Sequence, residues 1–279
     1  MDADRVYGFC GGGCGAVGEK NMNPASYFKE YRQVLGFSNQ SEAKEFLSGK
    51  DVKPNIDYKY IDALNSRVED IISSINTAAH DSVKLRDIDA FAKKNIYWPF
   101  GVIREARLLP RLNNQGRRPE EVLFSWLRGY AISEYFTPAF SEIFEVPLAS
   151  ISNIGDDDLR NIETFKRSPK ADLEIKIGRK IVRVEVQSGF QGINDIKEHK
   201  VRESRRVFEE KGICTICIHV DVYNGQVAFV RLDHVEENDV HFVTRQQMEG
   251  QSVFQIDQNY FKWRLLDKVP NLNELELGF

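Results

Sequence analysis

The sequence predicts an α/β (α+β) protein whose first half is helical and whose second half contains paired strands. In the first hundred residues, apolar side chains recur at spacings of three and four, the period of a helix that is buried on one side. Beyond Pro169 the apolar residues alternate with polar ones, the period of a half-buried strand. The two periods divide the chain into a helical part and a strand-rich part.

Length and composition indicate one compact domain spanning residues 1–279. Of the 279 residues, 42% are hydrophobic and 29% are charged, so the chain can bury a large core without disulfides or metals. The first residues lack the basic start and apolar run of a signal peptide, and no apolar run approaches the roughly 20 residues that cross a bilayer. We therefore expect a cytoplasmic protein with no membrane partner.

Positive charge is concentrated in two segments of this acidic chain. Residues 93–118 carry a net charge of +6 and residues 166–206 carry another +6, although the whole chain has a net charge of −4. Local basic blocks are typical of a cleft that binds a polyanion, because phosphate contacts need local rather than net charge. The alternative is that these charges lie on solvated helix faces.

Three helices are predicted before residue 80, at 27–35, 42–47 and 58–79. The longest has one apolar stripe, made of Ile61, Leu64, Val68, Ile71, Ile72 and Ile75. A further helix should begin at Pro119, which suits a first helical position, and should end before Pro138. Its inward residues are expected to be Val122, Leu123, Trp126, Leu127, Tyr130 and Ile132.

Residues 171–177 and 181–187 predict a β-hairpin. Gly178-Arg179 between them suits a two-residue type II′ turn, with glycine in the first central position. That turn pairs Ile177 with Lys180, which makes one face wholly aliphatic. It also sets Asp172 directly opposite Glu185.

This carboxylate pair is the unusual feature of the hairpin. Like charges directly across a sheet are destabilising, and each disfavours ionisation of the other. A divalent cation would offset the repulsion, since Mg²⁺ binds one or two carboxylates and completes its shell with water and phosphate oxygens. The alternatives are that Arg183 or a neighbouring basic residue neutralises both acids, or that the pair turns out to solvent.

The chain after the hairpin predicts a helix and two more strands. Asp195 and Glu198 resemble a capping box at the start of the helix, and Gly212 suits its end. An apolar strand at 213–223 should return as a second strand at 227–232, because the intervening Asn-Gly pair is a strong hairpin turn. The local order is therefore strand, strand, helix, strand, strand, preceded by a long helix.

These residues resemble the PD-(D/E)XK nuclease superfamily. Pro169-Lys170-Ala171-Asp172, followed across the hairpin by Glu185-Val186-Gln187, is similar to its motif, in which an Asp opens one strand and an acid-X-Lys triplet lies on the next. Two departures stand out: Pro169 lies three residues before Asp172, and Gln187 replaces the lysine. Some restriction endonucleases of this superfamily also end the triplet in Gln.

The resemblance covers roughly residues 119–232 and implies a restriction-endonuclease-like core, a mixed β-sheet flanked by helices. Residues 1–118 would then be a mainly helical N-terminal part and 233–279 a C-terminal extension. By the same resemblance, Asp172, Glu185 and the carbonyl of Val186 would hold Mg²⁺. Gln187 would position the attacking water, and Lys170 or Lys200 would supply the positive charge that Gln187 lacks.

The function that the resemblance implies is metal-dependent, sequence-specific hydrolysis of double-stranded DNA by a type II restriction endonuclease of a restriction system. Two identical sites related by a twofold axis would cut both strands of a palindrome most simply, so a homodimer is expected. A DNA repair nuclease or junction resolvase is the alternative enzyme. A non-catalytic DNA-binding protein with a decayed site is the alternative from another class, and Gln187 keeps it open.

Base readout is expected in the polar connection at 111–118. Arg binds guanine and Asn or Gln binds adenine through paired hydrogen bonds, and the connection offers Asn113, Asn114, Gln115, Arg117 and Arg118. Further DNA contacts are expected from Gln191, Asn194, Lys197 and Lys200. The alternative is a polar loop whose Asn and Gly residues only form turns.

Four other residue sets are weaker candidates. Cys10, Cys14, Cys214 and Cys217 could suggest zinc, but the last two should point to opposite faces of one strand. The glycines at 13–18 fit a dinucleotide motif without the strand it needs. Glu174 is expected to pair with Arg183 rather than act in chemistry, and Glu134 to be a solvated helix position.

Overall fold

The computed structural model describes residues 24–49, 51–112, 117–154, 171–236, 238–245 and 250–278. The chain divides into two compact units, one up to Lys53 and one from Pro54 to Phe279. Within the described residues, no helix is both long and apolar enough to cross a membrane.

The first unit contains helices α1 (Pro24–Val34) and α2 (Gln40–Leu47). Asn39 caps α2, since its side chain accepts a hydrogen bond from the backbone N–H of Glu42. Both helices were expected from the sequence, and each begins two or three residues earlier than the apolar pattern indicated.

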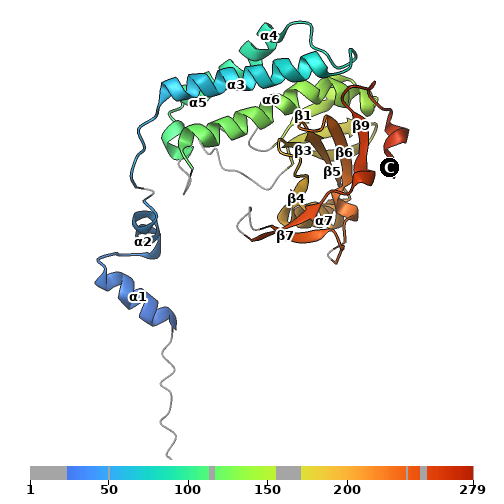
Figure 1. Cartoon of the computed structure of the whole chain (residues 1–279). Coiled ribbons are helices and arrows are strands. Elements are labelled where there is room, and N and C mark those ends of the chain that lie inside the picture. Colours follow the sequence, from blue (N-terminus) through green and yellow to red (C-terminus); the bar gives the residue numbers. More distant parts are fainter. Residues whose placement is uncertain are drawn as a thin grey trace, which may run out of the picture. The chain divides into compact units, whose positions relative to one another are not determined.

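The second unit begins with a helical layer. Its helices are α3 (Tyr58–Ala78), α4 (Ile88–Ala92), the π-helical turn η1 (Lys93–Tyr97), α5 (Trp98–Glu105), the 3₁₀ turn η2 (Leu109–Leu112) and α6 (Pro119–Ile143). The expected stripe of α3 is largely confirmed, because Ile61, Val68, Ile72 and Ile75 are buried. The two long helices, α3 and α6, pack side by side (Figure 1).

The predicted end of α6 was wrong. The helix does not stop before Pro138 but runs on to Ile143 with that proline inside it. Pro138 is exposed, so its ring lies on the solvent side. The following turn remains helical because Ala139, Phe140 and Ile143 are buried in the core, and this packing outweighs the hydrogen bond that proline removes.

A six-stranded mixed sheet lies against these helices, in the order β1-β2-β3-β5-β6-β9. Its strands are β1 (Ile151–Asn153), β2 (Leu173–Ile177), β3 (Lys180–Gly189), β5 (Cys214–Asp221), β6 (Gln226–Arg231) and β9 (Phe261–Arg264). The predicted fold class is confirmed. Helix α7 (Glu198–Lys211) joins β3 to β5, which run parallel, and all other pairs are antiparallel.

The predicted hairpin register is confirmed from Ile177–Lys180 to Leu173–Val184, but the expected Asp172–Glu185 pair is not part of the ladder. Gly178 has φ +60° whereas Arg179 is not a positive-φ residue, as a type II′ turn requires. Gly212 ends α7 with φ +65°, and the Asn-Gly turn joins β5 to β6 with Gly225 at φ +66°.

The two faces of the sheet differ in chemistry. The face toward α6, called the α6 face, is apolar and belongs to the main core with Leu173, Ile175, Val182, Val184, Ile216 and Ile218. The face toward α7, called the α7 face, carries the alternate residues Arg183, Glu185, Gln187, Thr215, Cys217 and His219. Helices thus cover both faces (Figure 1).

A small second sheet adjoins α7, in the order β4-β8-β7. Its strands are β4 (Asp195–Lys197), β8 (Gln251–Gln255) and β7 (Phe242–Arg245). The predicted capping box was therefore wrong: Asp195 lies in β4, and α7 begins at Glu198 without a side-chain cap. The carboxylate of Asp195 instead accepts hydrogen bonds from Arg245, at 2.9 and 3.2 Å.

Candidate active site

The hairpin brings Asp172 and Glu185 to the same place at the end of its ladder. The β2–β3 pairing ends at Leu173 and Val184, so Asp172 lies just before β2 while β3 continues. The Asp172 N–H donates to the carbonyl of Val184 at 3.0 Å. Its Oδ2 accepts from the N–H of Val186 at 2.7 Å. The first carboxylate is thus fixed to the backbone beside the second.

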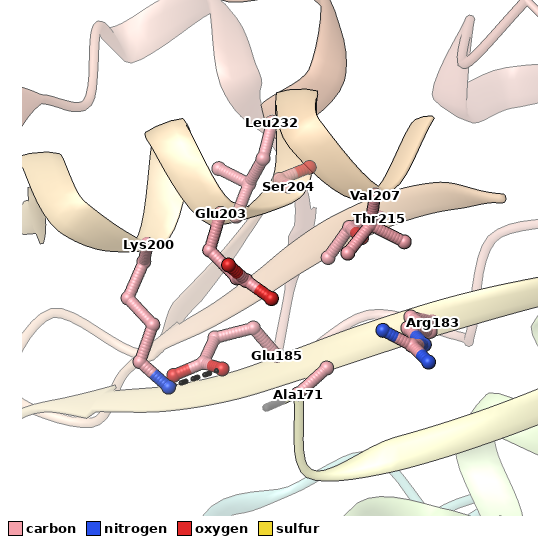
Figure 2. A pocket seen from close by; sticks show the side chains of 9 residues that line it. All are labelled: Ala171, Arg183, Glu185, Lys200, Glu203, Ser204, Val207, Thr215 and Leu232. Atoms are coloured by element: carbon pink, nitrogen blue, oxygen red, sulfur yellow. Dashed lines mark hydrogen bonds and ion pairs between the residues drawn. The ribbon is translucent and has the colours of Figure 1, made fainter. Parts of the chain in front are cut away.

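A lysine from α7 pairs with the second carboxylate. Lys200 Nζ lies 2.9 Å from Glu185 Oε2, and both side chains are largely buried. Figure 2 shows Lys200 reaching from the helix to Glu185 on β3. Burial acts to lower the pKa of Lys200, but the charges of Glu185 and Asp172 outweigh it and raise that pKa. Lys200 therefore offsets the repulsion between the two carboxylates. This was one of the alternatives to a divalent cation that the sequence left open.

Gln187 lies two residues beyond Glu185 on the same face of β3 and is half-buried. Its partner across the parallel β3–β5 ladder is His219. Because paired residues of neighbouring strands share a face, the histidine belongs to the same surface. Sequence reasoning left it out, because only the parallel register reveals this position.

His219 is anchored by a buried polar network. Its Nε2 lies 2.8 Å from Asn194 Oδ1, and the Asn194 Nδ2 donates to Asp221 at 3.2 Å. Since the amide turns its donor toward the carboxylate, Nε2 of His219 must be the protonated nitrogen. Nδ1 is then an acceptor, and it is buried without a hydrogen-bond partner among the described residues.

The charge states in this network are set by burial and hydrogen bonds. Burial lowers the pKa of His219 to about 4, against the opposing effect of Asp221, so the ring is neutral at pH 7. Burial alone would raise the pKa of Asp221, but hydrogen bonds from Asn224, Gln226 and Asn194 lower it. The network passes so close to Gly189 that a Cβ there would lie 2.9 Å from His219 Nε2, which excludes a side chain.

The donor chemistry at the hairpin end suits Mg²⁺. Asp172 and Glu185 provide two carboxylates, and the Val186 carbonyl is a further hard oxygen on the same strand. Within the described part of the chain, no group of three or more His, Cys, Asp or Glu side chains could hold a metal. A magnesium ion here would therefore need water and substrate oxygens to complete its shell.

The residues expected to read DNA lie in different surroundings. Asn113, Asn114 and Gln115 fall outside the described residues, as does Lys170. Arg117 is exposed, and its guanidinium donates to Ser125 Oγ at 2.6 Å. Arg118 pairs with Glu120 at 3.1 Å and lies over the Tyr60 ring, contacts that hold the start of α6 against α3.

The other four expected DNA contacts cluster near the end of β3. Gln191 and Lys197 are exposed, and Lys200 pairs with Glu185. Both polar groups of the Asn194 amide are engaged by His219 and Asp221. These two bonds fix the orientation of the Asn194 amide.

The residues that the sequence marked as weaker candidates have other contacts in the structure. Glu174 and Arg183 are cross-strand partners, but no ion pair joins their described side chains. Arg183 instead lines the small pocket of Figure 2 beside Glu185. Glu134 is half-buried and accepts from Asn153 Nδ2 at 2.9 Å, so it is not a solvated position. Cys217 is buried in the α7-side core and Cys214 is only partly buried.

Comparisons with known proteins add little to this geometry. No protein-family model and no curated protein matches the chain. Among solved structures, the Holliday junction resolvase Hjc of Archaeoglobus fulgidus matches with 11% identity and a TM-score of 0.27. That match covers 42% of this chain and 84% of the resolvase.

Proposed function

We propose that this protein is a magnesium-dependent nuclease that hydrolyses phosphodiester bonds in double-stranded DNA. The observation that carries the proposal is that Asp172, Glu185 and Lys200 lie together at the end of the β2–β3 ladder, where β3 continues beyond the first residue of β2. Two carboxylates beside a buried lysine can serve both a divalent cation and a phosphate that gains negative charge. The resemblance of these residues to the PD-(D/E)XK motif supports the same reaction.

Each residue would have a separate task. Asp172, Glu185 and the Val186 carbonyl would hold Mg²⁺, which when bound supplies Lewis acidity and an activated water. The amide of Gln187 would orient the attacking water from the same face of β3. Lys200 would place its positive charge where negative charge develops on the phosphate. It would thus supply the cation that is missing because Gln187 replaces the lysine of the motif.

We further propose the specific class that the motif implies, a type II restriction endonuclease that acts as a homodimer. This finer assignment is tested by the products. Discrete plasmid fragments support a restriction enzyme, cleavage confined to a four-way junction indicates a resolvase, and retarded but intact DNA indicates a binding protein with a decayed site.

The test of the reaction compares wild type with Asp172→Asn, on plasmid DNA with Mg²⁺ and with EDTA. Asparagine can still accept the Val186 N–H, so the hairpin should fold. Loss of the charge should slow cleavage on the order of 10³-fold, equivalent to several kcal/mol of lost transition-state stabilisation. Binding should persist.

Asp70→Asn is the matched control, because Asp70 is an exposed carboxylate on α3. It should cleave like the wild type. Wild-type cleavage by Asp172→Asn, or equal cleavage in EDTA, would refute the proposed reaction.

A further inference from the structure

An arginine on α6 lies between two aromatic rings close to the end of β3. The guanidinium carbon of Arg128 is 3.6 Å from the centre of the Phe190 ring and 5.0 Å from that of Phe124. Phe124 is one helical turn before Arg128, whereas Phe190 directly follows the last residue of β3. The Phe190 contact holds the guanidinium against the chain that follows β3.

This arginine has no counter-charge in the described part of the protein. No described carboxylate forms an ion pair with Arg128, and its Nε is buried without a hydrogen-bond partner. Burial lowers the pKa of Arg128, and the positive charge of Arg117 lowers it further. Glu121 lies on the same stripe of α6 but pairs with neither arginine. Two cations held together in this way create a local field that favours an anion.

A hydroxyl on α6 binds the second arginine. Ser125 accepts a hydrogen bond from Arg117, and it is three residues before Arg128 on α6, so the two share a helix face. A fixed guanidinium, a second cation and a hydroxyl are the groups that bind phosphodiester oxygens in protein–DNA complexes.

The position of this cluster relative to the chemistry is set by chain length. Phe190 is three residues beyond Gln187, and three residues span at most about 10 Å. Arg128 touches Phe190, which packs against the α6-face core, so the cluster lies on the α6 side of the sheet at the end of β3, whereas Glu185 and Gln187 lie on the α7 face. A phosphate bound by Arg128 would therefore lie at the same end of β3 as the candidate active site, on the α6 side of the sheet.

We propose that Arg128 and Arg117 form a seat for one backbone phosphate of duplex DNA, on the α6 side of the sheet end that carries the candidate active site. This inference rests on the proposed function, because it assigns a further contact to the same substrate. It assigns phosphate binding to Arg117, not base readout, and it gives Arg128 a role that the motif does not contain.

The experiment measures the salt dependence of duplex binding, in EDTA so that nothing is cleaved. Each lost phosphate contact should reduce the slope of log K against log [salt] by about 0.9. We expect Arg128→Met to lose about one contact, because methionine can fill the space between the rings without a charge. Arg128→Lys should keep most of the slope.

Arg117→Gln provides a second variant that does not depend on the ring stack, because Arg117 is exposed. It should also reduce the slope by about 0.9 and weaken binding to unrelated duplexes equally. The control is Arg264→Met, an exposed arginine on β9 at the far edge of the sheet. It should leave the slope unchanged.

Wild-type slopes in both Arg128→Met and Arg117→Gln would overturn the phosphate seat, even if the wild-type protein cleaves DNA in Mg²⁺. Reduced slopes in a protein that never cleaves DNA would support the seat and refute the nuclease. Absence of duplex binding by the wild type would overturn the seat, whereas the nuclease is tested separately by cleavage in Mg²⁺. If Arg117→Gln reduces the slope by the same amount on unrelated duplex sequences, base readout by Arg117 is excluded.

Discussion

The α6 face and the α7 face of the main sheet are made by the same strands but serve different ends. On the α6 face, Val184 and Ile218 are fully buried in an aliphatic and aromatic core. One residue away along each strand, Glu185 and His219 are also buried but polar. The Glu185 carboxylate is paired with Lys200 and the His219 Nε2 with Asn194, whereas His219 Nδ1 and Arg183 Nε are buried without a partner among the described residues.

This difference shows how a sheet combines stability with chemistry. Burial of apolar groups on one face stabilises the fold, whereas buried charges cost free energy unless they are paired. The α7 face thus depends on the stability supplied by the α6 face. Substitutions on the two faces should separate these contributions.

The largest change in stability should come from Phe136→Ala on the α6 side. Phe136 is fully buried and packs against Tyr135, Phe140 and Trp263. Removing the ring should lower the free energy of unfolding by about 3–5 kcal/mol, measured by urea denaturation. Phe208→Ala on α7, where the ring is 39% exposed, should cost much less. Similar losses of unfolding free energy in both variants would contradict the difference between the two faces.

The next largest effect should come from Lys200→Met on the α7 side, and it should appear in cleavage. Loss of the positive charge should slow DNA cleavage on the order of 10²-fold while binding persists. Adding Gln187→Lys should restore part of the rate, because it returns a cation to the triplet. Lys211→Met, at the exposed end of α7, is the control. Wild-type cleavage by Lys200→Met would mean that the lysine only neutralises Glu185.

The smallest of the three effects is the contribution of His219 to the pH dependence of the free energy of unfolding. The folded protein keeps this ring neutral down to its pKa of about 4, whereas in the unfolded chain it gains a proton below about pH 6.5. The unfolded state therefore binds more protons between these values, so the free energy of unfolding falls as the pH drops through this window.

Between pH 7 and about pH 4.5 this histidine should account for about 2 kcal/mol of lost stability. His219→Gln keeps a donor for Asn194 and cannot titrate, so its unfolding free energy should fall by that much less over the same range. Urea denaturation at the two pH values measures the difference. Identical pH dependence in both proteins would show that the ring is not held neutral.

Local patterns predicted the elements whose causes are local. The hairpin register followed from one glycine turn and strict alternation, and the end of α7 followed from Gly212. Pro138 misled because its local effect is real but smaller than the burial of Phe140 and Ile143 one turn later. The capping-box prediction was wrong because the Asp195 carboxylate pairs with Arg245, which is distant in the sequence. Asp195 therefore lies in the small second sheet instead of capping α7.

The candidate site divides in the same way. The closeness of Asp172 and Glu185 could be predicted from the turn between them, and Lys200 was one of two basic residues named for the missing charge. Asn194 was named only as a DNA contact, and its network with His219 and Asp221 could not be predicted, because the place of His219 beside Gln187 depends on the parallel pairing of β3 with β5. Arg128 was missed because its neighbour Phe190 comes from another part of the chain.

The contrast between the β2–β3 hairpin and the β3–β5 crossover also bears on the order of folding. A two-residue turn closes quickly, whereas parallel pairing must wait for α7 to bridge the strands. We therefore expect the two carboxylates to meet before Lys200 arrives to balance them. During that interval the nascent site is a region of uncompensated negative charge, and its rate of formation should depend on the ionic strength of the solution.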